Sequence, residues 1–361
     1  MGQGKLSGVK VVDLTLFLPG PMLTMMMADQ GAEVVKVEPP GGDPARNMEP
    51  FEASHSVWFT NANRGKKSIV CDLKTDAGKS ALWELIEGAD VFVEGFRPGV
   101  MQRLGFDYAA VAARNPAIIY CSLTAFGQHG ALADHPAHDM AVQALSGFLS
   151  VNDGQDGVPV VPGVASADMA GGLTALSAIL MALIGRASSG RGDYIDIAMF
   201  DAILPWCVHT ASSAIVGGDS PRSHEQRSLG GAAFYQVYET ADNRHIVLGA
   251  REEKFVRNLL GALGHADRVE EALRPAGQQG DLIELLRSIF AQKTQGDWTH
   301  WFADKDVAFA PVLNFREAFD SAHLQDRALI VEAKGRHHIA PAIRYASEDA
   351  WLPGKVPDLG A

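Results

Sequence analysis

Two ionisable side chains, His138 and Asp168, stand in one apolar part of the chain that is punctuated by glycine and proline. Asp168 shortly precedes an apolar run of helical period, residues 173–184, so backbone N–H groups and a helix dipole should surround its carboxylate. Each residue alone has a plainer interpretation, because Asp before a helix is usually an N-cap and a lone His is usually structural. Together, across a loop that could fold them over one cavity, they predict an acid/base pair.

Short apolar strands alternate with helices through the first 200 residues. We expect strands at residues 9–14, 33–37, 69–73, 89–94, 118–123 and 194–199, and helices at 22–29 and 76–88. This order, with strands that are apolar almost throughout, predicts a parallel sheet covered by helices on both faces. No G-x-G-x-x-G sequence follows the first strand, so nothing supports a nicotinamide or flavin cofactor.

A second, smaller domain follows the first. Residues 199–217 should be helical, and a polar segment rich in Gly, Ser and Arg, residues 218–231, indicates a linker. Two runs at 234–240 and 245–249 predict a hairpin, helices are expected at 253–263, 281–292 and 297–304, and residues 310–312 should lead back to the first domain. We therefore expect a large α/β domain at 1–200 with 325–361, a linker at 201–230 and a small α+β domain at 231–324.

The bulk composition argues against several classes of function. The chain has 361 residues, of which 47% are hydrophobic and 20% charged, and a formal net charge of −12. That acidity argues against nucleic-acid and anionic-membrane partners, so an anionic ligand would need a local basic patch. Cys71, Cys121 and Cys207 have no C-x-x-C spacing, so we expect neither a metal site nor a disulfide framework. We predict no signal peptide and no bilayer-spanning apolar run, and expect a cytoplasmic protein.

A basic run at residues 63–68 precedes the strand predicted at 69–73. On its residues alone, a solvated turn is the favoured interpretation. Its place beside a strand end of an α/β sheet is also where a phosphate group would bind.

Five segments resemble the family III CoA-transferase superfamily, which includes formyl-CoA transferase, the carnitine CoA-transferases and α-methylacyl-CoA racemase. They are residues 31–40, 63–68, 72–74 and 97–99 and the segment around Asp168, and the resemblance covers nearly the whole chain. It implies a Rossmann-like parallel sheet in the large domain, a smaller α+β domain and an interlocked homodimer. The active site would lie between the large domain of one chain and the small domain of the other. The substrate would be an acyl-CoA, with coenzyme A as part of the thioester and no permanently bound cofactor.

The resemblance also assigns residues to coenzyme A. Those implied to contact its phosphates, or in the case of Phe96 to lie near its adenine, are Arg64, Lys67, Lys74, Phe96, Arg97 and Arg103. Arginine suits this role because its planar guanidinium can donate two hydrogen bonds to one phosphate. One departure is that Pro39 follows Glu38 where the racemase-like pattern has an Arg, and Arg46 is the residue that could compensate.

The family scaffold supports two reactions. In a CoA-transferase, Asp168 would be a nucleophile that forms a mixed anhydride and then an aspartyl-CoA thioester. In a racemase, Asp168 and His138 would exchange the α-proton on opposite faces of the thioester, and Glu252 would hydrogen-bond the imidazole. Backbone N–H groups at the helix start would stabilise the enolate. A third possibility, from a different class, is a non-catalytic subunit that binds CoA esters.

The sequence around His138 favours the racemase. Ala137-His138-Asp139 is close to the Gly-His-Asp segment of racemases, whereas transferases have Tyr or Phe in place of His138. Val142 and Val164 point the other way, because racemases have Tyr and Asn at those places. We therefore expect a racemase or epimerase of 2-methylacyl-CoA-type thioesters, with CoA transfer as the alternative.

Overall fold

The computed structural model describes residues 4–154, 156–347 and 351–361, which fall into two compact units. Unit 1 comprises Met1–Ser146, Gly163–Trp206 and Ser321–Ala361, and unit 2 comprises Gly147–Pro162 and Cys207–Asp320. Each unit has its own sheet and its own hydrophobic core. The functional domain limits proposed from the sequence stay a prediction.

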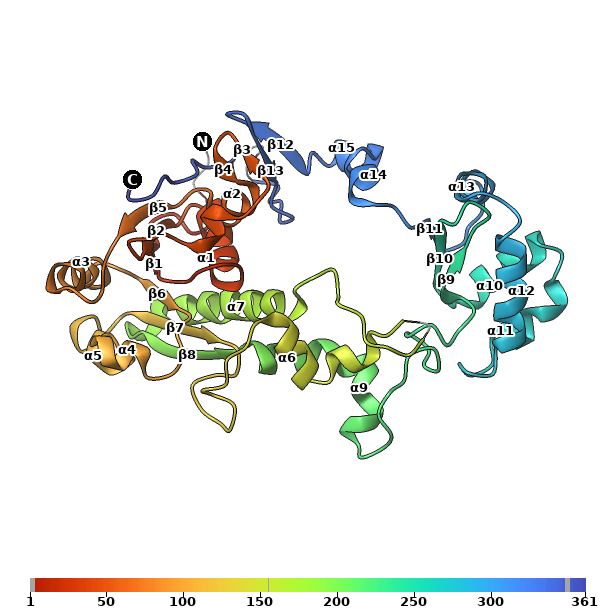
Figure 1. Cartoon of the computed structure of the whole chain (residues 1–361), viewed down its shortest axis with the longest axis horizontal. Helices are drawn as coiled ribbons and strands as arrows, with labels where there is room; N and C mark the ends of the chain where they lie inside the picture. The colour runs from red at the N-terminus through yellow and green to blue at the C-terminus, as the bar shows by residue number, and fades with distance from the viewer. Residues whose placement is uncertain (1–3, 155, 348–350) are drawn as a thin grey trace. The chain divides into compact units, whose positions relative to one another are not determined.

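Unit 1 is built on a six-stranded parallel sheet whose strand order is β5-β2-β1-β6-β7-β8 (Figure 1). The strands are β1 Lys10–Asp13, β2 Glu33–Glu38, β5 Lys67–Val70, β6 Val91–Glu94, β7 Ile119–Thr124 and β8 Asp193–Ala198. β6 is buried over its full length, and β7 over all but its last residue. This burial explains the nearly continuous apolar sequence of these strands, because a strand covered on both faces must be apolar on both. All five strand pairs are parallel, so the predicted parallel α/β sheet is confirmed.

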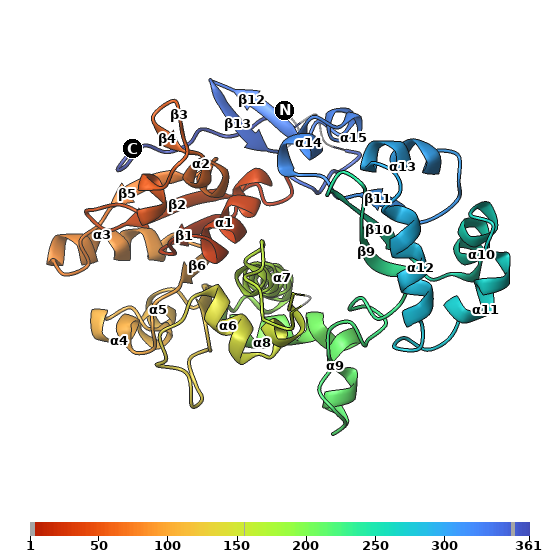
Figure 2. The ribbon, with the colours of Figure 1, turned by 45° about the vertical axis from the view of Figure 1, so that its right-hand side comes forward.

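Helices cover both faces of this sheet. On one face lie α3 Asp76–Glu87, α4 Val100–Leu104 and α5 Tyr108–Arg114. Their buried side chains form one core with residues of the strands, and this core includes Val12, Val37, Leu82, Met101, Val111 and Tyr120. α1 Pro19–Asp29 and α7 Ser166–Ser189 pack on the opposite face, where Figure 2 shows α1 beside β1 and β2.

The long helix α7 starts earlier than the run predicted at 173–184. Two small residues near its start allow a close approach: a Cβ on Gly172 would lie 2.8 Å from the Pro19 carbonyl oxygen, and one on Gly171 would lie 2.8 Å from the Met199 Cγ. By length and composition α7 could cross a membrane, contrary to the expectation that no run was long enough. In the structure, 33% of an 18-residue apolar stretch of this helix is buried.

Residues 199–217 do not form the single helix that the sequence predicts. α8 spans Met199–Ile203, a 3-10 turn spans Leu204–Cys207, and α9 spans Val208–Ile215. Pro205 explains the interruption, because proline has no N–H for the helix ladder and its ring clashes with the carbonyl four residues earlier.

Unit 2 has a three-stranded antiparallel sheet in the order β11-β10-β9. The predicted hairpin is confirmed as β9 Tyr235–Glu239 paired with β10 His245–Gly249. The sequence did not predict β11 Phe309–Pro311, which pairs with β10 and includes two of the three residues expected to lead back toward the first domain. As an edge strand, β11 can accommodate Pro311 despite its missing N–H.

The other elements are short or support the two sheets. In unit 2, a core of aliphatic and aromatic side chains is enclosed by α10 Glu253–Ala262, α11 Val269–Ala272, α12 Gly280–Phe290 and α13 Gln295–Phe302. α14 spans Phe315–Phe319. The rest of unit 1 contains α2 Val57–Asn63, α6 Asp139–Leu145, α15 Ala322–Asp326, β3 Phe51–Glu52, β4 His55–Ser56, β12 Ile330–Ala333 and β13 Arg336–Ile339. Further 3-10 turns span Pro44–Asn47, Phe148–Val151 and Ala266–Arg268.

Candidate active site

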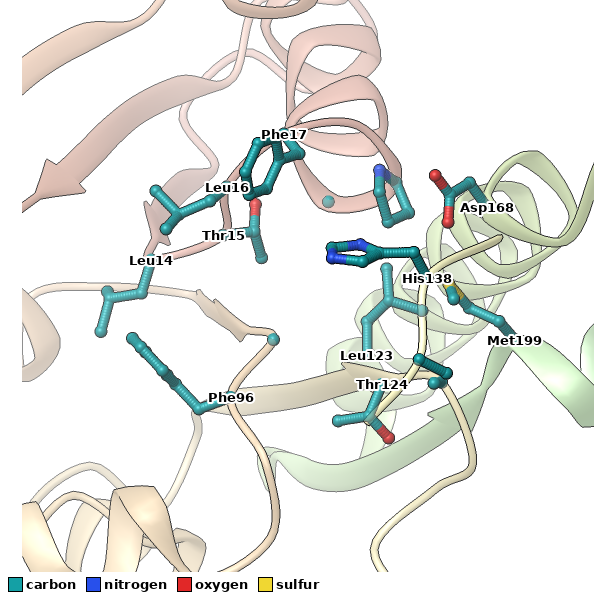
Figure 3. A pocket seen from close by; sticks show the side chains of 15 residues that line it. Leu14, Thr15, Leu16, Phe17, Phe96, Leu123, Thr124, His138, Asp168 and Met199 are labelled. Atoms are coloured by element: carbon teal, nitrogen blue, oxygen red, sulfur yellow. The ribbon is translucent and has the colours of Figure 1, made fainter. Parts of the chain in front are cut away.

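A cavity of about 280 Å³ opens at the carboxyl ends of β1, β6 and β7 in unit 1 (Figure 3). That edge of a parallel sheet is where α/β proteins generally bind ligands. Asp168 and His138 both line it, and most of the remaining side chains are apolar: Leu14, Leu16, Phe17, Phe96, Leu123 and Met199. Among the residues described, its lining contains no Lys or Arg.

Asp168 is not the N-cap that a plain structural interpretation predicts. α7 begins at Ser166, its N-cap is Ala165, and Asp168 is the third residue of the first turn. The carboxylate is half-buried and faces the same space as the His138 ring in Figure 3. Burial raises the pKa of Asp168, and the charge of Asp139 raises it further, to about 7. Both ionisation states are therefore populated near neutral pH, which suits an acid/base group or a basic nucleophile.

The carboxylate that caps α7 comes from another helix. Oδ1 of Asp139 accepts hydrogen bonds from the N–H groups of Ala167 at 2.8 Å and Asp168 at 3.1 Å. Oδ2 of Asp139 accepts a hydrogen bond from Nε2 of Gln143, a buried residue one turn later in α6. The N–H groups of Ala167 and Asp168 are thus occupied. These two N–H groups are therefore not free to stabilise an enolate, and the wider expectation that N–H groups at the helix start do so stays a prediction.

His138 is the N-cap of α6, and its carbonyl oxygen accepts hydrogen bonds from the first turn of that helix. Its side chain is exposed and meets the edge of the Phe17 ring, with ring centroids 6.1 Å apart at an interplanar angle of 83°. Phe17 has a φ of 63°, an unusual conformation for a residue with a large side chain. The imidazole therefore has an aromatic neighbour on one side and the cavity on the other (Figure 3).

A buried ionic network behind the cavity holds the loop that contains Phe17. Nζ of Lys36 donates to the carbonyl oxygen of Thr15 at 2.7 Å and pairs with Asp43 at 2.8 Å. Lys66 pairs with Asp13 at 3.0 Å. Burial opposes ionisation of Asp13, but Lys66 and Lys36 outweigh it and lower the pKa of that carboxyl to about 2. Sequence reasoning missed this network, although two lysines in or beside apolar strands were a visible signal.

The turn after β6 lines the cavity that contains Asp168 and also two other cavities in unit 1. Phe96 also lines a cavity of about 360 Å³, and Arg97 lines both that cavity and a third of about 540 Å³. Arg103 is exposed on α4, where its N–H donates to the carbonyl of Gly99. Phe96 and Arg97 therefore lie on one turn beside the cavity that contains Asp168, and Arg103 lies in the helix that follows this turn.

The remaining basic residues proposed for coenzyme A differ in their surroundings. Arg64 is 2% exposed, and its guanidinium is paired with Asp29 at 2.6 Å. Lys67 is exposed but lies at the start of β5, whereas the cavity lies at the carboxyl ends of the strands. Lys74 is exposed and follows the carboxyl end of β5. Arg46, the possible substitute for a missing arginine, pairs with Glu38 at 2.6 Å.

Glu252 lies in unit 2, exposed, as the N-cap of α10, and its side chain makes no capping hydrogen bond. Its predicted contact with His138 stays a prediction. Among the described residues, no group of three His, Cys, Asp or Glu side chains could hold a metal ion.

The comparisons with known proteins agree with this architecture. A family model described as CoA-transferase family III matches residues 6–361. The acetyl-CoA:oxalate CoA-transferase of Acetobacter aceti is 33% identical over 92% of this chain and 87% of its own length. The α-methylacyl-CoA racemase of Homo sapiens is 32% identical over 91% of this chain and 83% of its own. A crystal structure of a CAIB/BAIF family protein from Brucella suis matches with a TM-score of 0.87 at 29% identity, covering 99% of this chain and 97% of that one.

Further similar proteins, at 31–34% identity, are also named as acyl-CoA or CoA-transferases. The expectation that racemisation is the first choice is therefore not confirmed, and CoA transfer is better supported. Both names belong to enzymes that process coenzyme A thioesters. The chain belongs to CoA-transferase family III.

Proposed function

We propose that this enzyme transfers coenzyme A between two carboxylic acids and that Asp168 is the group that carries it. The observation that supports this most directly is the Asp168 carboxylate at the wall of an apolar cavity on the ligand-binding edge of the sheet. A pKa of about 7 makes this carboxylate a stronger base than an ordinary aspartate, yet leaves much of it ionised at neutral pH. The transferase names of similar proteins in Acetobacter aceti and humans support the same reaction.

The reaction would proceed in four exchanges at carbonyl carbons. An Asp168 oxygen attacks the donor thioester, the C–S bond breaks, and a mixed anhydride and CoA thiolate form. The thiolate then attacks the aspartyl carbonyl, which releases the donor acid as its carboxylate and leaves an aspartyl-CoA thioester. The acceptor carboxylate attacks this thioester and displaces the thiolate, forming a second anhydride. The thiolate finally attacks the acceptor's carbonyl, which yields the new acyl-CoA and restores the Asp168 carboxylate.

Coenzyme A would follow the turn after β6. Phe96 offers an aromatic surface next to the reactive cavity, and Arg97 and Arg103 offer guanidinium groups suited to phosphate. Lys74 adds an exposed cation beyond β5. Arg64 is already paired with Asp29 and precedes the start of β5, so we assign it no phosphate contact. Lys67 has weaker support, because it lies at the other end of its strand.

A second candidate is exchange of the α-proton, as in a racemase. The specific observation in its favour is that His138 lines the same cavity as Asp168. A two-base exchange needs groups that can hold or release a proton near neutral pH, and the Asp168 pKa of about 7 meets that need. The acyl group would be apolar in either reaction, because the described lining of the cavity offers no cation for a second carboxylate.

One substrate can separate the candidates. 2-Methylbutanoyl-CoA has an apolar acyl chain and a single α-proton, so it can report both reactions. We expect the wild-type enzyme to move CoA from it to free labelled 2-methylbutanoate, with label appearing in the acyl-CoA by liquid chromatography and mass spectrometry. Incorporation of solvent deuterium at the α-carbon without such transfer would overturn the first candidate in favour of the second. Binding with neither activity would indicate a non-catalytic CoA-ester-binding subunit.

A further inference from the structure

Asp139 connects the two helices that carry the reactive side chains. It is the first residue of α6, directly after His138, and both of its oxygens are engaged. One oxygen receives the N–H groups of Ala167 and Asp168 at the start of α7, and the other receives the Gln143 amide. Figures 1 and 2 show α6 beside the start of α7. A single carboxylate therefore ties the backbone at Asp168 to the segment that contains His138.

We propose that Asp139 is a positioning residue for the reaction: its carboxylate fixes the first turn of α7 against α6 and takes up the N–H donors that would otherwise serve Asp168. This inference rests on the proposed reactive role of Asp168. It does not depend on whether the reaction is CoA transfer or α-proton exchange, because both need the Asp168 carboxyl in a fixed place and a suitable ionisation state.

The electrostatics of the helix start support this role. A carboxylate in the first turn of a long helix is ordinarily stabilised by the helix dipole and free N–H groups, which lower its pKa. At Asp168 the pKa is raised instead, first by burial and then by the negative charge of Asp139. Asp139 thus has two effects: it accepts the N–H groups at the start of α7, and its negative charge disfavours ionisation of Asp168.

The ionisable groups on the other elements packed against α7 do not account for the raised pKa of Asp168. On the elements packed against α7 they are His138 before α6, Asp29 on α1, Asp201 on α8, Tyr120 and Cys121 on β7, and Asp193, Tyr194 and Asp196 on β8. Asp29 is paired with Arg64. Burial raises the pKa of Tyr120, Cys121 and Tyr194, so these three are neutral near pH 7. The charge that acts on the pKa of Asp168 is that of Asp139.

Asp139→Asn is the variant that isolates the charge. Its side-chain oxygen can still accept both N–H groups at the start of α7, so the first turn keeps its cap. Its new amide N–H group can donate to Gln143, whose Oε1 is buried and has no hydrogen-bond partner in the structure, once the Gln143 amide turns over. The substitution therefore removes one negative charge while residue 139 keeps its hydrogen bonds to the start of α7 and to Gln143.

The measurement is the titration of Asp168 by NMR of protein labelled with ¹³C at aspartate carboxyls, with Asp168→Asn used to assign the signal. We expect a pKa near 7 in the wild type and a value lower by about one pH unit or more in Asp139→Asn. Asp201→Asn is the matched control, because it removes an exposed charge from α8, another neighbour of α7, and should leave the titration unchanged. The same downward shift should appear in the pH profile of kcat/KM, whereas a merely structural role would lower the rate at every pH equally.

An Asp168 titration that is identical in the wild type and in folded Asp139→Asn would overturn the inference. If Asp139→Asn does not fold, the wild-type titration still decides, because an Asp168 pKa at or below the ordinary value of 3.8 would also overturn the inference. The NMR measurement needs no turnover. If Asp139→Asn lowers the Asp168 pKa but the wild-type enzyme has no CoA activity, only the proposed function is refuted. If the wild-type enzyme is active but Asp139→Asn leaves the Asp168 pKa unchanged, only this inference is refuted.

Discussion

At the scale of single residues, the raised pKa of Asp168 makes this carboxyl a source of instability in the folded protein. Its folded pKa of about 7 lies above the ordinary value of 3.8. Below about pH 3.8, Asp168 is protonated in both the folded and the unfolded protein, and its burial carries no ionisation cost. As the pH rises from there to about 7, the unfolded state ionises first, so the folded protein loses stability. A reactive group held in an unfavourable ionisation state is a common reason for a trade-off between stability and function.

Asp168→Asn should thus stabilise the protein at pH 8 while abolishing turnover. Asparagine is nearly isosteric and stays neutral, so the free energy of unfolding should rise by ~1–3 kcal/mol at pH 8. Denaturant unfolding at pH 8 and at pH 4 is the measurement, and the gain should be largely gone at pH 4. A variant that is less stable than the wild type at pH 8 would show that Asp168 is not destabilised in the folded state.

His138→Ala separates the two candidate reactions. CoA transfer through Asp168 gives the imidazole no required proton transfer, so the transfer rate should fall by less than about tenfold, whereas α-proton exchange should fall by about 10²-fold or more. Both rates can be followed with 2-methylbutanoyl-CoA in deuterated water. A loss of transfer as large as that expected for exchange would mean that His138 is essential to the transfer chemistry itself.

The residue types around the site could be found in the sequence, but their partners could not. Asp168 and His138 stood out because both are ionisable in an apolar segment, and they do line one cavity. Asp139 did not stand out, because the N–H groups that it caps lie 28 and 29 residues further along the chain. Whether an aspartate before an apolar run is the cap or the reactive group depends on which carboxylate reaches the N–H groups, and that is decided by tertiary contact.

At the scale of elements, the position of α7 depends on close backbone approach near its start. Gly172→Ala should destabilise the protein, because the added Cβ would lie 2.8 Å from the backbone oxygen of Pro19. Gly185→Ala is the matched change at an exposed position of the same helix with nothing within 4 Å, and it should stabilise by ~0.5–1 kcal/mol. Thermal unfolding of both variants tests this. Equal effects of the two substitutions would contradict the packing described for α7.

The order of the helices and strands in unit 1 was predictable from the sequence, but several element boundaries were not. Apolar strands at regular intervals predicted the parallel sheet, because such strands must be covered on both faces. The helix expected at 199–217 is broken at Pro205, a proline signal that was visible in the sequence. β11 was missed, because a short edge strand containing Pro311 has too little pattern to distinguish it from a loop.

At the scale of the whole molecule, the interlocked homodimer implied by the family resemblance can be tested by complementation. Glu252 has a proposed role only in α-proton exchange, through His138. If each site combines Asp168 of one chain with Glu252 of the other, Asp168→Asn and Glu252→Gln chains should each lose exchange activity alone. Refolded as a mixture, they should regain about a quarter of wild-type activity, because half of the dimers are mixed and each mixed dimer has one intact site. No recovery from a mixture shown to be dimeric would place both residues' functions within one chain, or remove Glu252 from the site.

The choice between reactions could not be predicted from the overall fold, because one family and one architecture include both transferases and a racemase. That choice depends on which groups meet the substrate at the cavity. Function is decided by the site rather than by the scaffold.

The most direct test of the central claim follows the oxygen atoms of the acceptor acid. The enzyme is incubated with 2-methylbutanoyl-CoA and 2-methylbutanoate labelled with ¹⁸O in its carboxylate, and the peptide that contains Asp168 is examined by mass spectrometry. Because the second anhydride joins the two acids through an acceptor oxygen, we predict that ¹⁸O enters the Asp168 carboxylate during transfer. Transfer of CoA with no ¹⁸O in that peptide would contradict the account.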